Sequence, residues 1–357
     1  MGQSIFYKFI ILQVFPQGPP GPDPGARGEA NIVSKIRKLP AAFAKLISSV
    51  LSTTVIDLNW QGRPRSIASA LLRCEDFSAL IDPGPASTLP ELRQHLQQCG
   101  ISVPKLNAVF LTHIHLDHAG ASGTLVRENP NLKVYVHAKG VPHLLDPTKL
   151  LQSASRLWGD ELPRLFGEFL PVPAENLVAL GGGETIRLGS SPLEVLYTPG
   201  HASHHVTYFD PASATAFVGD TAGVSINGHP FVFPVTPPPD ISIELWDVSL
   251  DAIAALRPKK LFLAHFSYSE SPGAHIASYR KRLRLWRDLS ADILARNLGE
   301  SGAMHHFIEV AEADAAQYLT QEELSHYVFN GAVHLSWLGL VRYHRKRAEV
   351  TVNTTAV

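Results

Sequence analysis

The sequence places three histidines and one aspartate within a single short stretch. Residues 112–118 read Thr-His-Ile-His-Leu-Asp-His, and the apolar run Val109-Phe110-Leu111 comes directly before them. A short apolar run that ends in a polar stretch predicts a buried strand that opens into a loop. His113 and His115 are two residues apart, so both point the same way at the strand's end. Asp117 and His118 follow in the next turn, within reach of a second position nearby.

This combination of side chains predicts a metal centre. Imidazole is a good ligand for zinc and other first-row metals. One carboxylate among several histidines suits catalytic zinc or iron better than calcium or magnesium, which prefer shells made only of oxygen. A single loop histidine is most often no ligand, but a cluster of this composition and spacing is typical of a metal site.

The cluster resembles the H-x-H-x-D-H motif of the metallo-β-lactamase superfamily, the αββα metallohydrolases. Three later segments are similar to the family's other ligand motifs: residues 197–201 (Tyr-Thr-Pro-Gly-His), 217–220 (Phe-Val-Gly-Asp) and 261–265 (Leu-Phe-Leu-Ala-His). They nominate His201, Asp220 and His265. The resemblance extends over about residues 52 to 268 and fills every ligand position of the family in order.

The resemblance implies a site for two metals. One would be held by His113, His115 and His201, and the other by Asp117, His118 and His265, with Asp220 between them. The expected cofactor is two Zn²⁺, with iron or manganese as alternatives. Two metals about 3.5 to 4 Å apart bind one water jointly and lower its pKa, so a bridging hydroxide would be the nucleophile. Asp117 is then a candidate proton shuttle, which makes Asp117 and Asp220 the candidate catalytic residues.

The fold class that the resemblance implies is a four-layer αββα sandwich with a C-terminal helical appendage. We expect the catalytic domain over residues 52–270, with strands at 53–58, 66–72 and 77–82 and a helix over 90–100. A helical insertion is expected near 141–173 and a C-terminal helical region over 271–357. Asp82 lies in a segment similar to the family's turn below the metal loop, so we expect it to support the site without binding metal. For His204 and His205, orienting a ligand and simple packing are both left open.

The N-terminal segment differs from the rest. Residues 5–15 are apolar, but Lys8 and Gln13 interrupt them, and the run is too short to span a bilayer. It lacks the basic start and the small-residue cleavage site of a signal peptide. Residues 16–30 are rich in Pro and Gly, so residues 1–31 are expected to be a disordered extension. Residues 32–51 keep helical apolar spacing and predict an amphipathic helix that packs on protein.

Two segments near the expected site indicate an apolar substrate. Residues 141–173 contain many large apolar side chains, Trp158 among them, and are expected either to form a lid or to bury core as a helical layer. Residues 225–240 combine Phe231 and Phe233 with the run Pro237-Pro238-Pro239. A proline-stiffened backbone with exposed aromatic side chains makes a good substrate wall. We therefore expect Phe231, Phe233 and Trp158 to contact the substrate.

The net charge and the cysteine content limit which partners and which cellular location we expect. The formal net charge is −1, so no overall field attracts nucleic acid or an acidic membrane, and the expected partner is a small-molecule substrate. An oligomer is left open. Cys74 and Cys99 lie at no ligand position and are expected as free thiols, which favours the reducing cytoplasm. The basic stretches 280–287 and 342–347 are expected to be solvated faces, with anion binding as the alternative.

Several functions remain in competition. The favoured one is a dinuclear zinc hydrolase of a thioester, lactone or carboxylic ester with a hydrophobic acyl part, similar to glyoxalase II or lactonases. Asp220 argues against a true β-lactamase, because those branches generally have Cys or Ser at that position. An RNase Z-like phosphodiesterase would use the same ligands and need an extended basic surface. An iron persulfide dioxygenase is a further alternative, whereas a non-catalytic scaffold would normally lack a ligand.

Overall fold

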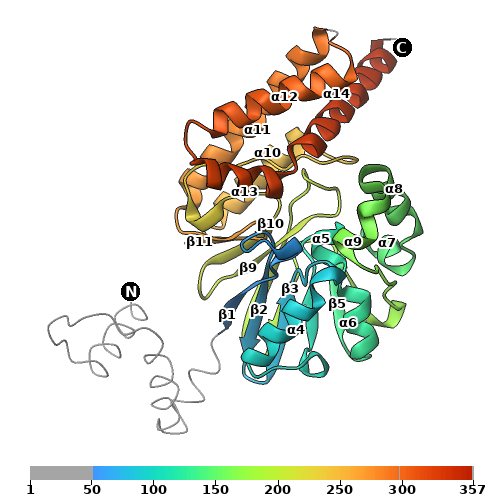
Figure 1. Ribbon diagram of the computed structural model, residues 1–357. Coiled ribbons are helices and arrows are strands. Elements are labelled where there is room, and N and C mark those ends of the chain that lie inside the picture. The colour runs from blue at the N-terminus through green and yellow to red at the C-terminus, as the bar shows by residue number, and fades with distance from the viewer. Residues whose placement is uncertain (1–50, 297, 356–357) are drawn as a thin grey trace, which may run out of the picture. The chain divides into compact units, whose positions relative to one another are not determined.

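The computed structural model describes residues 51–296 and 298–355, with the side chains of 350–355 left out. Two six-stranded β-sheets pack face to face, and helices cover the outer face of each (Figure 1). The four-layer αββα sandwich expected from the sequence is therefore confirmed. Two predictions concern residues outside the described part: the disorder of residues 1–31 and nearly all of the helix over 32–51.

The first sheet contains the strands of the N-terminal half in chain order. They are β1 (Ser52–Asp57), β2 (Ala68–Cys74), β3 (Phe77–Ile81), β4 (Ala108–Phe110), β5 (Lys133–His137) and β6 (Leu177–Leu180). The first three pair antiparallel, and β3 to β6 pair parallel. Parallel neighbours need crossover connections, which are supplied by α4 (Leu89–Gln98), by α5 (Leu116–Ala119) with α6 (Ser122–Glu128), and by an insertion after β5.

The insertion consists of helices, as the sequence predicted. It contains α7 (Val141–Leu145), α8 (Thr148–Trp158) and α9 (Leu162–Phe166). Leu144, Ala154 and Phe166 are buried in the same core as the outer face of the first sheet. Short 3-10 turns complete this half: η1 (Trp60–Gly62), η2 (Ala86–Thr88), η3 (Val103–Lys105), η4 (Gly159–Glu161) and η5 (Ala174–Asn176).

The second sheet has the order β12-β11-β10-β9-β8-β7. Its strands are β7 (Thr185–Leu188), β8 (Ser191–Tyr197), β9 (Val206–Asp210), β10 (Thr215–Gly219), β11 (Lys260–Leu263) and β12 (Ser267–Ser269). Only β10 and β11 pair parallel, and α10 (Ile243–Ala255) connects them after the turn η6 (Ile226–Gly228). Apolar side chains such as Phe110, Tyr208 and Phe217 fill the space between the sheets.

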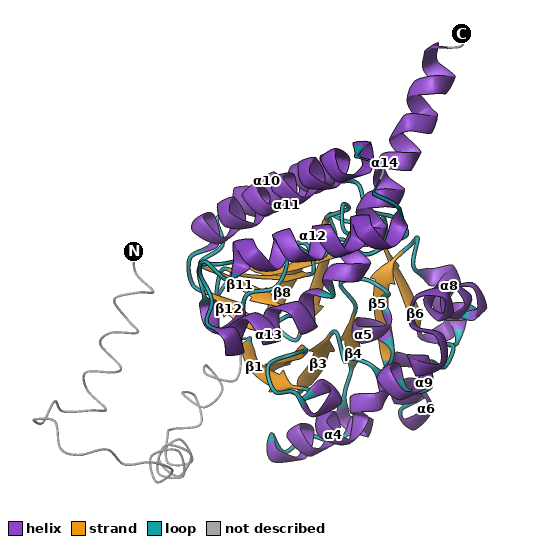
Figure 2. Cartoon of the chain, turned by 45° about the horizontal axis from the view of Figure 1, so that its top comes forward, coloured by secondary structure: helices purple, strands orange, loops and turns teal. Residues whose placement is uncertain are grey.

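The C-terminal region is helical and forms the outer layer of the second sheet. It comprises α11 (Pro272–Ala295), α12 (Glu300–Ala315), α13 (Gln321–Gly331) and α14 (Val333–Thr355), and Figure 2 shows α11 and α12 running over the sheet. Trp286 and Phe307 of these helices share one apolar core with Val218 and Leu263 of the strands. No helix among the described residues is long and apolar enough to cross a membrane. Cys74 and Cys99 form no disulfide, as expected.

Candidate metal centre

The seven candidate ligands gather at one end of the sandwich, because each follows or ends a strand there. His113 and His115 lie in the loop after β4, and α5 then carries Asp117 and His118. The other three come from the second sheet: His201 lies between β8 and β9, Asp220 follows β10, and His265 follows β11. The fold thereby brings together residues that are more than 150 positions apart in the sequence, and they form two groups able to hold a metal ion.

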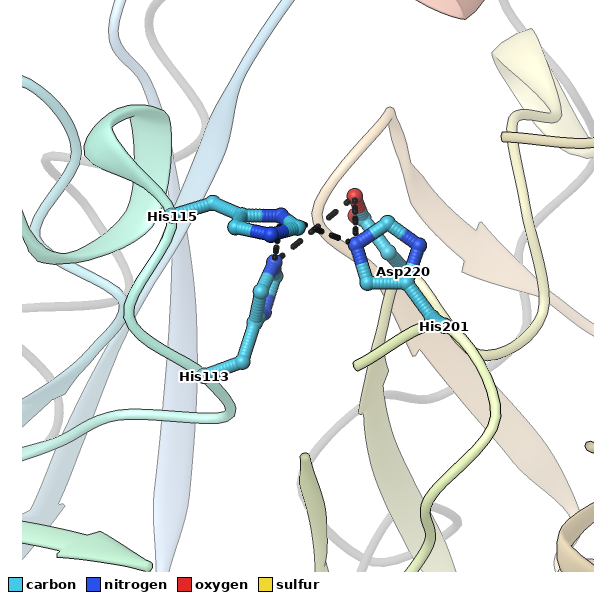
Figure 3. Close-up of side chains that lie close together, drawn as sticks. All are labelled: His113, His115, His201 and Asp220. Carbon is cyan, nitrogen blue, oxygen red and sulfur yellow. Dashed lines mark hydrogen bonds and ion pairs between the residues drawn. The ribbon is translucent and has the colours of Figure 1, made fainter. Parts of the chain in front are cut away.

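The first group consists of His113, His115, His201 and Asp220, whose polar atoms converge on one point (Figure 3). Nδ1 of His115 lies 3.0 Å from Nε2 of His113 and 2.9 Å from Nε2 of His201. Oδ2 of Asp220 lies 3.5 Å from Nε2 of His201 and 3.9 Å from Nε2 of His113. Three imidazole nitrogens and one carboxylate oxygen therefore surround a common centre.

The second group consists of Asp117, His118 and His265. Oδ2 of Asp117 lies 3.3 Å from Nε2 of His265 and 3.5 Å from Nε2 of His118. The other oxygen of Asp220, Oδ1, lies 3.3 Å from Nε2 of His118 and 3.5 Å from Nε2 of His265. Asp220 thus faces the first group with one carboxylate oxygen and the second group with the other.

Hydrogen bonds behind the rings fix which nitrogen faces the centre. Nδ1 of His265 lies 2.8 Å from the carbonyl of Ser66, and Nδ1 of His201 lies 3.0 Å from the carbonyl of Val235. A carbonyl only accepts, so each Nδ1 carries the proton and donates it, which leaves the lone pair on Nε2. Such support from behind is the usual arrangement for a histidine that binds metal.

Asp82 holds His118 in the same way. Its Oδ2 lies 2.9 Å from Nδ1 of His118 and accepts a hydrogen bond of 2.6 Å from Oγ1 of Thr112. Its Oδ1 accepts from the backbone N–H of Thr112 at 2.8 Å. Asp82 belongs to neither ligand group. The structure therefore places it behind a candidate ligand, which is the position expected from the sequence.

The donor atoms fit a pair of cations. Nε2 of His118 and Oδ1 of Asp220 are buried and have no hydrogen-bond partner within the described part of the chain. Buried polar atoms in proteins are nearly always hydrogen-bonded. Two atoms without such a bond, one in each ligand group, therefore require an explanation. A cation held by both atoms satisfies them, and so does a proton on Nε2 that is donated to Oδ1 across 3.3 Å. Imidazole nitrogens with carboxylate oxygens suit zinc, iron and manganese, and no sulfur ligand is present in either group.

The protonation states without metal also favour cation binding at most positions. Burial lowers the pKa of His115 to about 3, with the charge of His201 acting in the same direction. Burial raises the pKa of Asp117, but the charges of His118 and His265 and a hydrogen bond from His265 bring it to about 2. His118 and His265 are the exceptions. Burial lowers the pKa of each, but Asp220 and Asp117 raise both above the usual value, and Asp82 adds to the rise for His118. A proton on His118 therefore competes with a cation.

His204 and His205 lie beside the two groups and belong to neither. His205 is fully buried, and its Nδ1 lies 3.0 Å from Oγ1 of Thr198 and 3.1 Å from Oγ1 of Thr221. Its ring centroid is 5.0 Å from that of His113, with the rings stacked. The ring of His204 lies farther away, 6.2 Å from His113, and its buried Nδ1 has no hydrogen-bond partner among the described residues. His205 packs against the site.

A pocket of about 140 Å³ opens beside the ligands His115, Asp117, Asp220 and His265. Trp158 lines the pocket, and its contact with a substrate stays a prediction. Helix α8 contributes other lining side chains. The helices of the insertion bury core, and some of their side chains also line the pocket, whereas their role as a lid stays a prediction.

The expectation that Phe231 and Phe233 are exposed is wrong. Their exposed fractions are 2% and 1%, and neither side chain lines the pocket. Phe233 packs edge-on against Trp286 of α11, and the guanidinium of Arg282 lies 3.9 Å above the ring of Phe231. The helices that follow in the chain cover this segment, which the local sequence did not reveal. The neighbouring prolines Pro237, Pro238 and Pro239 do line the pocket.

Trp60, Phe329 and Asn330 line the pocket but were not singled out by the sequence analysis, whereas Phe166 belongs to the insertion that it considered. Trp60 lies in the turn after β1, Phe166 ends α9, and Phe329 and Asn330 lie near the end of α13. None of them is part of a motif. The only signal was that Trp60 interrupts the otherwise polar stretch 59–66.

The two basic stretches are ion-paired. Arg280 and Arg284 both contact Asp247 of α10, at 3.1 Å and 2.9 Å. Arg282 differs from the expected solvated face, because it is buried and pairs with Asp314 at 3.1 Å. In the second stretch Lys346 pairs with Asp240 at 3.6 Å, and Arg342 donates to the carbonyl of Pro239.

Comparison with known proteins identifies a family and several relatives. A family model described as the metallo-beta-lactamase superfamily matches residues 62–265. The metallo-beta-lactamase fold-containing protein ST1585 of Sulfurisphaera tokodaii is 30% identical over 203 residues, which are 56% of this chain and 72% of that protein. A hydroxyacylglutathione hydrolase of Legionella pneumophila is 26% identical over 187 residues, 52% of this chain and 56% of the relative. The chain thus matches only about half the length of this second relative.

A solved structure supports the fold over a longer range. The metallo-beta-lactamase family protein TTHA1429 from Thermus thermophilus superposes with a TM-score of 0.61 and covers 84% of this chain and 94% of its own. Its identity to this chain is 19%, so the likeness concerns the fold.

Proposed function

The chain belongs to the metallo-beta-lactamase superfamily, and from that premise we propose that it is a hydrolase of a thioester, lactone or carboxylic ester that works with two Zn²⁺ ions. The observation that carries the proposal is the position of Asp220. Its two carboxylate oxygens face two separate groups of histidine nitrogens, each within 3.9 Å. A single residue shared in this way is what a two-metal site needs.

Each candidate ligand has a defined task in this proposal. His113, His115 and His201 would hold one cation, and Asp117, His118 and His265 the other, with Asp220 shared. When bound, such a pair of cations supplies a water of lowered pKa and polarises the oxygen of the bond that is cleaved. Zinc is proposed over iron or manganese because its coordination tolerates this mixed set of imidazole and carboxylate without redox chemistry.

The chain's own contribution to proton transfer would come from Asp117. It lines the pocket, and its side chain is 26% exposed, whereas Asp220 is almost fully buried. A carboxylate at the pocket edge can hold the proton taken from water and donate it to the leaving group. Oδ2 of Asp117 faces His265, which leaves Oδ1 as the atom for this task.

The surroundings of the site support an ester-type substrate over a phosphodiester. Trp158, Leu150 and Leu157 line the pocket, and none of the described residues that line it is lysine or arginine. A phosphodiesterase acting on RNA needs an extended basic surface. Five basic residues of the stretches 280–287 and 342–347 instead have acidic or carbonyl partners: Arg280, Arg282, Arg284, Arg342 and Lys346. The small-molecule substrate that we propose matches the size of the pocket. Two cysteines that form no disulfide support the cytoplasm as the proposed location.

Metal analysis combined with a substrate screen tests the proposal. The full chain, purified and reconstituted with Zn²⁺, is expected to hold about two metal ions and to hydrolyse members of a thioester, lactone and carboxylic ester panel. The double variant Asp117→Ala with Asp220→Ala is the blank. Trace metal only, or turnover confined to phosphodiesters, refutes the proposal. Oxygen consumption with a persulfide after loading with Fe²⁺, without hydrolysis in any metal form, would establish the dioxygenase alternative instead.

A further inference from the structure

Four aromatic rings form a continuous wall along one side of the pocket. The ring centroids of Trp158 and Phe166 are 5.4 Å apart, those of Phe166 and Trp60 are 5.6 Å apart, and those of Trp60 and Phe329 are 5.3 Å apart. All four side chains line the pocket. Such spacing is that of packed aromatic pairs, so the rings support one another as a single apolar surface.

Polar atoms of the wall itself are turned away from a substrate. Nε1 of Trp60 donates to the carbonyl of Leu165 at 2.7 Å, so the indole is satisfied within the protein. The guanidinium of Arg63 lies 4.2 Å from the centre of the Phe329 ring but is not among the residues that line the pocket. Away from the candidate metal ligands, the lining thus offers an apolar substrate group a large contact area and offers an anion no lysine or arginine.

Asn330 is a polar residue of this lining that belongs to neither ligand group. It is 9% exposed, and its Nδ2 donates to the carbonyl of Arg65 at 3.1 Å. A carbonyl accepts only, so this bond fixes which end of the amide is the NH₂ group. The remaining atom, Oδ1, is buried and has no hydrogen-bond partner among the described residues. A buried acceptor without a donor is costly, and a ligand that brings a donor recovers that cost.

We propose that the substrate's acyl group is uncharged, sits against the wall of Trp60, Trp158, Phe166 and Phe329, and carries an N–H or O–H that donates to Oδ1 of Asn330. The inference rests on the proposed hydrolase function and names the acyl group that this function acts on. The pocket volume of about 140 Å³ sets the size. A cavity of about 150 Å³ accommodates benzene, so an acyl group of about six to seven non-hydrogen atoms fits.

Matched thiophenyl esters test the donor directly. One pair, N-acetylglycyl and 4-oxopentanoyl, exchanges an amide N–H for CH₂. The other, 3-hydroxyhexanoyl and hexanoyl, removes a hydroxyl. With the full chain loaded with Zn²⁺, kcat/KM is expected to favour the donor in at least one pair by about 10-fold or more, because a site built around a hydrogen bond rejects the analogue that lacks it. The pair that discriminates tells whether the donor is an amide or a hydroxyl. A ratio near one for both pairs overturns the proposal.

The variant Asn330→Leu removes the acceptor and is expected to bring the discriminating ratio to about one. An unchanged ratio in a folded Asn330→Leu protein overturns the proposal. Asn176→Leu is the matched control, since Asn176 is also buried and its Nδ2 donates to the carbonyls of Pro130 and Leu132, away from the pocket. It is expected to lose stability and to keep the wild-type ratio. Should Asn330→Leu fail to fold, the wild-type ratios still decide.

A charged substrate tests the other half of the proposal. The hexanoyl ester is expected to react about 100-fold better than the ester of the same chain ending in a carboxylate, because the aromatic wall offers that carboxylate no lysine or arginine. Phe329→Lys places an ammonium in the wall and is expected to reduce this preference about 10-fold or more. A wild-type enzyme that prefers the anionic ester overturns the proposal.

Binding measurements keep this inference separate from the proposed hydrolase function. Ketone analogues in which CH₂ replaces sulfur cannot be hydrolysed, and they are expected to quench the fluorescence of Trp60 and Trp158. The donor-bearing ketone should bind about 10-fold more tightly than its donor-free match. If this holds while no ester is turned over, the hydrolase proposal fails and the inference stands. Equal binding of all matched ketones, together with turnover, refutes the inference alone.

Discussion

Oδ2 of Asp82 lies 2.9 Å from Nδ1 of His118, and both groups are buried. This contact leaves Nε2 of His118 facing Asp220 and Asp117. The backbone N–H and the hydroxyl of Thr112 hold the carboxylate from its other side. Asp82 belongs to neither ligand group. Its carboxylate connects the loop after β3 with the histidine cluster and sets the orientation of a candidate metal ligand.

The variant Asp82→Asn is expected to weaken metal affinity about 10- to 100-fold, which is typical when a carboxylate behind a metal-binding histidine is changed. Competition with a chelator measures this change. The control is Asp210→Asn, because Asp210 is also buried and accepts hydrogen bonds from the backbone of Ala212 and Ser213 at the far end of β9. It should lose stability and keep its affinity. Equal affinity in both variants would contradict the role given to Asp82.

A second prediction concerns Gly219, the residue before Asp220. Its φ is +48°, and a Cβ there would lie 2.5 Å from Oγ1 of Thr112 and 2.7 Å from Nε2 of His205. Gly219→Ala is expected to cost about 1–2 kcal/mol for the backbone conformation and about 1–3 kcal/mol more for the overlap. Urea unfolding measures the loss. Gly100→Ala is the control, since φ is +72° there but a Cβ would meet no atom within 4 Å. Equal losses of stability in the two variants would show that the atoms around Gly219 move aside without an energetic cost.

Acid sensitivity provides a third prediction, through His275 of α11. Burial lowers its pKa to about 4, although its Nε2 donates to the carbonyl of Ala222 at 2.8 Å. The unfolded state binds this proton near the usual pKa of 6.5 and the folded state only near 4. The contribution of His275 to stability is therefore full above pH 6.5 and is lost as the pH falls toward 4, by ~3 kcal/mol at most.

His275→Gln keeps a donor near the Nε2 position and removes the titration. Metal-free wild type and variant should have similar stability at about pH 7.5, and the variant should become the more stable one as the pH falls below about 6.5. Denaturant unfolding at several pH values gives the difference. Parallel curves for the two proteins down to about pH 4 would disprove the assignment.

The strand-end motifs explain why the sequence located the seven candidate ligands. His113 to His118, His201, Asp220 and His265 each follow a short apolar run, and the structure shows that those runs are strands or their edges. Side chains at the ends of neighbouring strands meet, so local patterns are enough to nominate them. The helices of the insertion were equally visible, because their apolar spacing is local.

The pocket lining was not predictable in this way. Asn330 and Arg65 are 265 positions apart and meet only because α13 lies against the turn after β1. Trp60 and Phe329 are neighbours for the same reason. Phe231 and Phe233 show the converse, since a proline-rich segment was interpreted as exposed when later helices bury it. In both cases helices that are distant in the sequence decide which side chains are buried, and the local sequence does not indicate that packing.

The burial of Phe233 leads to the last prediction. Its ring packs against Trp286 and lies so close to Gly331 that a Cβ on that glycine would be 2.4 Å from Cδ1 of the phenylalanine. Phe233→Ala is expected to cost about 3–5 kcal/mol of folding stability, as for other large core truncations. At a temperature where the variant is folded, its kcat/KM should change by the same factor for short and long acyl esters. Trp158→Ala, which alters the pocket lining, should instead lose activity on the longer esters selectively. A loss of kcat/KM selective for longer esters in Phe233→Ala would show that this residue contacts the substrate. A uniform loss in both variants would show that Trp158 does not.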